Sequence, residues 1–211
     1  MIVLPSRHKR KFRKKTFSEL KDIARILIID DKASGLVKPL KNEGWRASQI
    51  KDVANLNITE LRDAHILCID ILGVGKKMSF PNEGLGLVRA IREEYPSKRI
   101  LLYSSVSSHD IFDDAIDLVD MRLPKEGQPY PFIVAVHELA ELAFDWDSCV
   151  ADIYQRFREE IPDEMTEIEF NKKVRKCLSS NGNIDVEKLI KIAFVGVKTA
   201  KAIEGIMSSI P

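Results

Sequence analysis

The chain has 211 residues, of which 45% are hydrophobic and 31% charged, and its formal net charge is +1 at pH 7. This balance is typical of a globular protein and excludes a disordered chain, and the length suits one domain with an appendage or two small domains. The longest apolar runs have about six residues, whereas a membrane helix needs roughly 20. The basic N-terminal segment is not followed by an apolar region, so we expect no secretory signal. We therefore expect a cytoplasmic protein without a membrane partner.

The charge is unevenly distributed along the chain. Residues 1–25 carry nine Lys or Arg and two Asp or Glu, so this segment is about +7 and the remainder about −6. The most basic stretch is RHKRKFRKK, at residues 7–15. It is either a solvated tail or a segment that binds nucleic acid or an acidic partner.

Strand-like and helical patterns alternate over the next 120 or so residues. Strands are predicted at residues 25–30, 46–53, 65–70, 99–105 and 118–125, the second of them at an edge of the sheet. Helices are predicted at residues 36–44, 57–64, 84–96, 110–117 and 131–144, with Asn57 or Thr59 as the cap of the second. Strands separated by helices predict βαβ units, and therefore an α/β fold with a parallel sheet covered on both faces.

Beyond about residue 147 the pattern is helical only. Helices are predicted at residues 148–162, 166–180 and 186–210, with a turn at 181–183. Thr166 is expected to cap the second of these helices, and Gly196 can divide the third in two. Because so few residues of helix rarely support a core alone, we expect them to dock on the sheet domain, on a second copy in a homodimer, or on a partner. The predicted organisation is a basic arm at 1–23, an α/β domain at 24–147 and a helical extension at 148–211.

The cysteines and histidines give no metal-binding pattern. Cys68, Cys149 and Cys177 are far apart in the sequence, and we interpret them as buried thiols in a reducing compartment. His137 begins the segment HELAE, which is similar to the start of a zincin helix. Because Glu141 stands where the second histidine ligand would be, an exposed pair one helical turn apart is the better interpretation.

Polar side chains close the predicted strands. The carboxyl ends of parallel strands meet at one edge of an open α/β sheet, where such folds place their sites. The residues that this rule selects are Asp30, Asp31, Asp70, Ser104 and Lys125. The three carboxylates would repel one another unless a cation lies among them, and Mg²⁺ prefers such oxygen ligands. An aspartate beside this ion can accept a phosphoryl group, whose oxygens a hydroxyl and an ammonium group would contact.

The order of these segments resembles the receiver domain of two-component response regulators. IIDD, CID, LYSS and LPK each close a strand in the order of that family, and the resemblance covers residues 24–145. It implies a flavodoxin-like sheet with strand order 2-1-3-4-5, Asp30 and Asp31 as the metal-binding pair, and Asp70 as the phosphoacceptor. It also implies that Ser104 is the switch hydroxyl and that Lys125 pairs with the phosphoryl group. The expected partner is a histidine kinase or a phosphotransfer protein, and the protein would not be an enzyme beyond its own phosphorylation and dephosphorylation.

Three features depart from the family pattern. Glu126 follows the lysine where receivers usually have a proline, Arg122 stands where they have an aromatic residue, and the loop after Asp70 is unusually long. An alternative is therefore a pseudo-receiver, which serves as a scaffold or dimerisation module without phosphorylation. A weaker alternative is a DNA-binding regulator that uses the basic arm. The segment KIAFVGVKTAKAIEGI matches a helix-turn-helix only with a spacing one residue short, and helix packing explains it equally well.

A phosphatase of the haloacid dehalogenase class also uses strand-end Asp, Ser or Thr, and Lys residues. That class needs a second aspartate two residues after the first, and here Lys32 occupies that place. It also needs an acidic pair after the lysine, which no predicted strand end supplies. We therefore rank this class below the receiver.

Overall fold

The computed structural model describes residues 13–105, 114–178, 184–193 and 195–209. Residues 1–12 of the basic arm, residues 110–113 of the helix predicted at 110–117 and the turn predicted at 181–183 lie outside the described residues. The chain forms two compact units, Thr16–Ala143 and Phe144–Pro211, the second grouped with Met1–Lys15. Each unit is described by itself.

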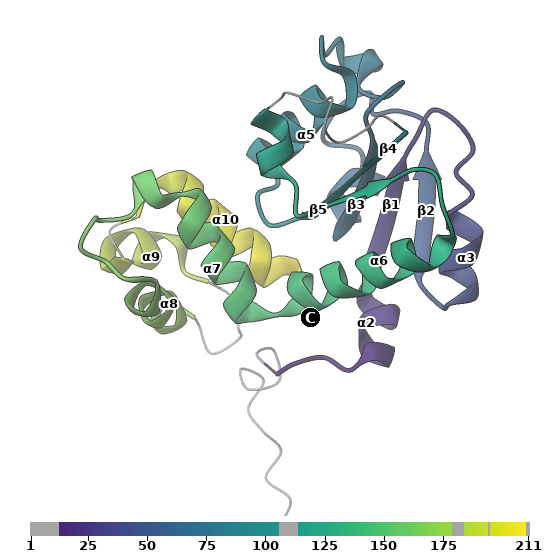
Figure 1. Ribbon diagram of the computed structural model, residues 1–211. Helices are drawn as coiled ribbons and strands as arrows, with labels where there is room; N and C mark the ends of the chain where they lie inside the picture. The colour runs from purple at the N-terminus through teal and green to yellow at the C-terminus, as the bar shows by residue number, and fades with distance from the viewer. Residues whose placement is uncertain (1–12, 106–113, 179–183, 194, 210–211) are drawn as a thin grey trace, which may run out of the picture. The chain divides into compact units, whose positions relative to one another are not determined.

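The unit Thr16–Ala143 is built on a five-stranded parallel sheet (Figure 1). Its strands are β1 (Arg25–Ile29), β2 (Arg46–Ile50), β3 (Ile66–Asp70), β4 (Arg99–Ser104) and β5 (Met121–Pro124). Their order in the sheet is β2-β1-β3-β4-β5, with β2 at one edge. The predicted flavodoxin-like doubly wound fold is confirmed, because this order places the first crossover to one side of β1 and the later ones to the other.

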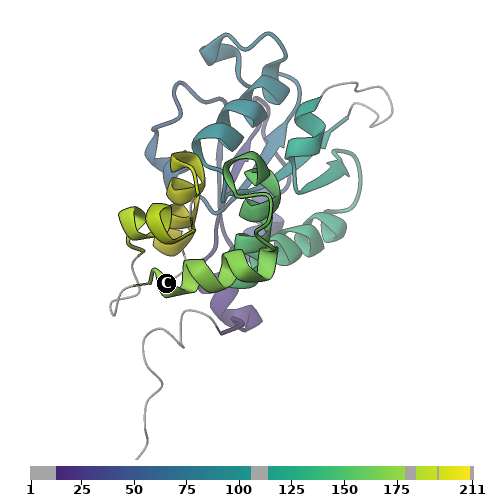
Figure 2. The same ribbon diagram turned by 90° about the vertical axis from the view of Figure 1, so that its left-hand side faces the viewer.

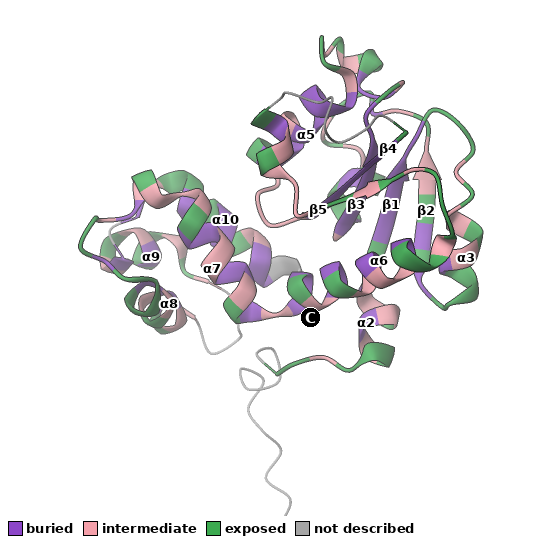
Figure 3. Ribbon diagram, viewed as in Figure 1, coloured by how far each residue is buried: buried purple, intermediate pink, exposed green. Residues whose placement is uncertain are grey.

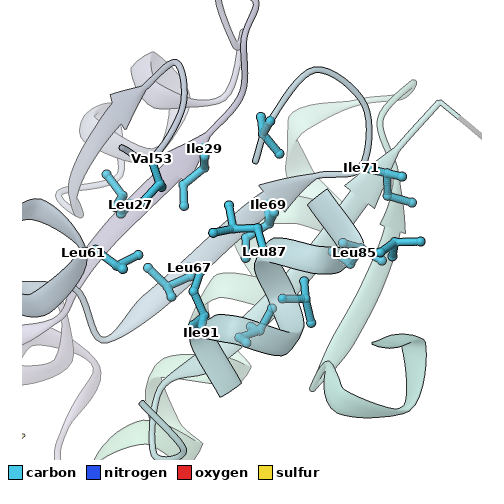
Figure 4. Close-up of a cluster of buried hydrophobic side chains, with 14 of the residues drawn as sticks. Leu27, Ile29, Val53, Leu61, Leu67, Ile69, Ile71, Leu85, Leu87 and Ile91 are labelled. Atoms are coloured by element: carbon cyan, nitrogen blue, oxygen red, sulfur yellow. The ribbon is translucent and has the colours of Figure 1, made fainter. Parts of the chain in front are cut away.

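One face of the sheet packs against α4 (Thr59–Asp63), α5 (Glu83–Glu94) and the 3-10 helix η2 (Asp114–Leu118). Leu67 and Ile69 of β3 lie beside Ile91 and Leu87 of α5 in this layer, as Figure 4 shows. Alternate residues of β1, β3 and β4 point to this face. Because helices cover both faces, the central strands are buried along most of their length (Figure 3).

The opposite face packs against α6 (Pro129–Phe144), where Phe132 meets Tyr103 of β4. Helix α2 (Phe17–Ile23) lies beside α6, with the Phe17 and His137 rings 4.4 Å apart, and α3 (Val37–Asn42) packs on β2. Helix α2 occupies the end of the segment assigned to the basic arm. A capping box between Thr16 and Glu19 begins it, and its buried Leu20 anchors it.

Some local predictions are wrong. Neither Asn57 nor Thr59 caps α4, whose N-cap is Ile58 without a side-chain hydrogen bond. The described part of the helix predicted at 110–117 is the 3-10 helix η2. The helix predicted at 148–162 ends at Arg156, and a 3-10 turn, η3 (Arg158–Glu160), follows. There Arg158 donates to the carbonyl oxygens of Ile161 and Pro162, which holds the chain in a turn rather than in a further helical turn.

The unit Phe144–Pro211 contains α7 (Trp146–Arg156), α8 (Glu167–Lys176), α9 (Val186–Ala193) and α10 (Val197–Ser209). Neighbouring helices pack in the order α7-α8-α9-α10, and α10 also packs on α7 (Figure 2, green to yellow). Thr166 caps α8 through a capping box with Glu169, as predicted for this residue. The last predicted helix is divided near Gly196 into α9 and α10. Buried residues from all four helices, such as Val150, Phe170, Leu189 and Ile203, form a core within this unit.

Two further predictions concern the cysteines and His137. Cys68, Cys149 and Cys177 are all buried, as predicted. His137 lies 4.0 Å from Glu141 across one turn of α6, which is the expected helical pair. Among the helices of the described residues, none combines the length and the apolar character that crossing a membrane requires.

Candidate functional site

Three carboxylates gather where β1 and β3 end. Asp30 directly follows β1, Asp31 follows Asp30, and Asp70 is the last residue of β3. Ligand oxygens of all three lie within 4.8 Å of one another. Asp30 and Asp70 are buried, with exposed fractions of 0% and 4%, while Asp31 is exposed. The adjacent strands β1 and β3 thus bring together the three aspartates that the sequence analysis selected.

Lys125 supplies a positive charge to this cluster. It follows β5, and its Nζ lies 2.5 Å from Asp70 Oδ2 and 2.9 Å from Asp30 Oδ2. Burial acts to lower the pKa of Lys125, but its hydrogen bonds to Asp70 and Asp30 outweigh that effect and hold the pKa above its usual value. The lysine therefore stays charged, and it balances one of the three carboxylate charges.

Ser104 is the last residue of β4 and is buried at the same edge of the sheet. Its carbonyl oxygen accepts the N–H of Lys125 at 2.8 Å, so the backbone fixes the lysine next to the serine. Ser104 lies one residue beyond Tyr103, which pairs with Asp70 in the β3–β4 register. All five predicted residues therefore lie at one edge of the sheet.

Tyr103 belongs to the site although its place in the sequence did not indicate this. Its hydroxyl donates to Asp30 Oδ2 at 2.8 Å, and its exposed fraction is 1%. Because β3 separates β4 from β1, the tyrosine side chain reaches across a whole strand, a span of about 10 Å between backbones. Burial, together with the hydrogen bond to the Asp30 carboxylate and its charge, raises the pKa of Tyr103, so this hydroxyl stays a donor.

The chain just after β1 is held by Gln49 of β2. The Gln49 amide nitrogen donates to the carbonyl oxygens of Asp30 at 3.0 Å and Lys32 at 2.6 Å. Its side-chain oxygen accepts the backbone N–H of Ser34. The N–H of Lys32 in turn donates to Asp30 Oδ1 at 3.0 Å. These bonds fix the turn that carries Asp30 and Asp31. The one sequence feature that could have suggested these bonds is the polar residue Gln49 in the edge strand.

The long loop after Asp70 is tied to the site at several points. Asp52 accepts the N–H groups of Gly75 and Lys77, at 2.5 and 2.9 Å. Gly73 has a positive φ of 87°, and a Cβ there would collide with the Asp31 carboxylate. Gly84, in the first turn of α5, packs directly on the backbone of Asp70 and Ile71. The loop and the start of α5 therefore approach Asp31 and Asp70 closely, because glycine occupies both contact points, Gly73 and Gly84.

This arrangement fits a hard divalent cation. All three ligands are carboxylates, and oxygen donors of this kind are what Mg²⁺ prefers. The cluster with Lys125 carries two uncompensated negative charges, two of the three carboxylates are buried, and Gly73 leaves room beside the third. Such charge concentrated at a sheet edge is costly unless a cation balances it. Asp30, Asp31 and Asp70 are thus the residues that would hold Mg²⁺.

The fold places the acidic cluster at a typical ligand-binding position. The unit Thr16–Ala143 is a flavodoxin-like α/β domain, with an acidic cluster and a lysine at the carboxyl edge of its sheet. In open α/β sheets this edge is where ligands bind, at the point where the strand order reverses around β1 and β3.

Comparisons with known proteins found similarity to solved structures. No protein-family model and no curated protein matches the sequence. A response regulator from Thermotoga maritima is similar in structure, with 19% identity and a TM-score of 0.44 over 56% of this chain and 97% of that one. TrrA from the same organism, in complex with Mg²⁺-BeF, has 21% identity and a TM-score of 0.46 over 55% and 98%. The receiver domain of NtrX from Brucella abortus has 20% identity and a TM-score of 0.46 over the same shares.

Proposed function

We propose that the protein is a cytoplasmic two-component response regulator that is phosphorylated on Asp70 in the presence of Mg²⁺. The observation that carries this proposal is the contact of Lys125 with both Asp70 and Asp30, next to Asp31. A buried aspartate that shares its edge with two further carboxylates and an ammonium group is suited to nucleophilic attack on phosphorus, because the cations offset the charge of the phosphoryl oxygens.

Each residue has a defined part in the proposed transfer. A carboxylate oxygen of Asp70 attacks the phosphorus of a phosphohistidine or of a small phosphodonor. The bond between phosphorus and the donor atom breaks, and the leaving group keeps the electron pair. Lys125 then pairs with a phosphoryl oxygen, and the Ser104 hydroxyl donates to another. When bound, Mg²⁺ supplies the charge neutralisation that brings the carboxylates and the phosphoryl group together.

The phosphoryl group would come from a histidine kinase or a phosphotransfer protein, and the protein would act as a phosphoacceptor rather than as an enzyme. Its output would be a protein–protein interaction of the helical unit that contains α7 to α10. The exposed side chains of that unit, which include Ile168 at 82% and Val197 at 59%, are compatible with a binding surface.

Incubation of the full chain with a small phosphodonor and Mg²⁺, followed by a phosphoprotein gel, tests this proposal. We expect a shifted band for wild type and no shift for Asp70→Asn. Asp63→Asn is the matched control, because Asp63 lies on α4 and pairs with Arg25 away from the acidic edge. The absence of a shift in wild type, or an equal shift in Asp70→Asn, would refute the proposal.

The second candidate is a pseudo-receiver that binds partners without phosphorylation. It is favoured by the contacts of Asp30 Oδ2, which accepts from both Tyr103 and Lys125, so that this oxygen is satisfied without an ion. The phosphoryl mimic beryllofluoride with Mg²⁺ separates the two candidates. An unaltered NMR spectrum supports the pseudo-receiver, whereas widespread shifts support the switch.

A further inference from the structure

Tyr103 joins the acidic site to helix α6. Its hydroxyl donates to Asp30 Oδ2 at 2.8 Å, and its ring meets that of Phe132 edge to face, with the centroids 5.7 Å apart. Both side chains are buried, with exposed fractions of 1% and 5%. Phe132 lies in the first turn of α6. One rigid side chain therefore contacts a carboxylate of the site at one end and helix α6 at the other.

We propose that Tyr103 is a positioning residue that orients Asp30 for the divalent ion and transmits ion binding to α6. This inference rests on the proposed function, because it assigns a role at the same acidic site. It does not depend on whether Asp70 becomes phosphorylated.

The hydrogen bonds of Asp30 give the reason for the orienting role. A carboxylate oxygen accepts about two hydrogen bonds, and Oδ2 receives them from Tyr103 and Lys125. Oδ1 accepts the N–H of Lys32, which leaves one lone pair of Oδ1 for an ion. The tyrosine hydroxyl therefore helps to fix which oxygen faces the ion. Hydrogen-bonding partners of this kind commonly change metal affinity by about tenfold or more when they are removed.

The packing of Tyr103 gives the reason for transmission. An ion that draws Asp30 toward itself moves the acceptor of the tyrosine hydroxyl, and the ring must follow to keep this bond. In a close-packed interior, a shift of the ring is felt by Phe132. Helix α6 is a single rod of 16 residues that includes the buried Val136 and Leu139, and the chain passes from its last residue to α7 through Asp145 alone. A movement at Phe132 is thus passed along one helix toward the second unit in the chain.

Mg²⁺ titrations of the full chain test this inference without any phosphodonor. Calorimetry measures the affinity, and methyl NMR of Val136 and Leu139 measures the response of α6. Tyr103→Phe removes the hydroxyl and keeps the ring. Tyr95→Phe is the matched control, because the Tyr95 hydroxyl donates to the carbonyl oxygen of Leu56, away from the acidic cluster.

We expect wild type and Tyr95→Phe to bind Mg²⁺ equally and to show the same shifts in α6. Tyr103→Phe should bind about tenfold more weakly, and at saturation its α6 shifts should be lost. Phe132→Leu breaks the other end of the connection, so it should bind Mg²⁺ as wild type does and also lose the α6 shifts. This second variant separates transmission from a general loss of packing around Tyr103.

The inference is overturned if saturated Tyr103→Phe shows the α6 shifts of wild type, or if Mg²⁺ leaves α6 of wild type unchanged. Its failure is distinct from that of the proposed function. A chain that shifts α6 through Tyr103 but is never phosphorylated would overturn the proposed function alone. A chain that is phosphorylated on Asp70, with equal α6 shifts in wild type and Tyr103→Phe, would overturn the role of Tyr103 alone.

Discussion

The Nζ of Lys125 lies 2.5 Å from Oδ2 of Asp70, although 55 residues separate them in the sequence. The same nitrogen contacts Asp30, whose side chain is fully buried. One ammonium group therefore stabilises two carboxylates that end neighbouring strands. The positions of the ends of β1, β3 and β5 account for this contact.

Replacement of Lys125 by Met should lower the free energy of unfolding by about 3 kcal/mol, because it leaves two buried carboxylates without their cation. Urea denaturation in the presence of a chelator measures this loss. Lys191→Met is the control, since the pair of Lys191 with Glu187 is highly exposed and should contribute less than about 0.5 kcal/mol. Lys125→Met should also bind Mg²⁺ more tightly than wild type, because a competing cation has been removed. Wild-type stability of Lys125→Met would contradict this account.

Gly84→Ala should disturb the backbone that carries Asp70. A Cβ at this position would collide with the carbonyl oxygen of Asp70 and the backbone of Ile71, so α5 or the loop must move. We expect a loss of about 1–3 kcal/mol in unfolding free energy, together with weaker Mg²⁺ binding. Gly35→Ala is the control, because a Cβ there meets no atom within 4 Å. Equal behaviour of the two variants would show that the close approach of α5 to Asp70 is not needed.

The strand ends could be predicted from the sequence, whereas the contacts between them could not. Asp30 and Asp70 each follow an aliphatic run, and Lys125 ends the strand predicted at 118–125. The rule that parallel strands share their carboxyl edge brings the three residues together. Tyr103 stands inside such a run, where its aromatic ring indicates only a buried strand. Its partner Asp30 lies 73 residues away in the chain and two strands away in the sheet. Which face each side chain takes, and how far it reaches, depends on the register, which the pattern of apolar residues does not specify.

A buried ionic group stabilises the amino ends of β4 and β5, opposite the acidic cluster. Asp120 accepts from Arg92 at 2.8 Å and from Arg99 at 3.1 Å, and all three side chains are at most 7% exposed. Asp120→Asn should cost about 3 kcal/mol, because both guanidinium groups lose their buried counter-charge. Asp114→Asn, which affects an exposed pair with Arg89, should cost less than about 1 kcal/mol. Denaturation midpoints of the two variants check this difference, and similar midpoints would count against it.

The pH dependence of stability should contain a contribution from His65. Burial, with the nearby charges of Lys98 and Arg25, lowers the pKa of His65 to about 4, and its Nδ1 accepts the N–H of Arg25. Between pH 6.5 and 4 the unfolded chain therefore binds a proton that the folded chain excludes, so stability falls as the pH falls through this range. The loss should be about 2–3 kcal/mol. It should be smaller in His65→Asn, and an imidazole resonance of His65 that titrates near pH 6.5 would disagree with this prediction.

The most direct measurement of the central claim is the location of the phosphoryl group by tandem mass spectrometry. The full chain is treated with a small phosphodonor, with Mg²⁺ or with a chelator, and the labile acyl phosphate is trapped chemically before digestion. The account predicts one phosphoryl group on Asp70, formed with Mg²⁺ and absent with the chelator. A phosphoryl group on another residue, equal labelling without Mg²⁺, or no labelling of wild type would contradict it.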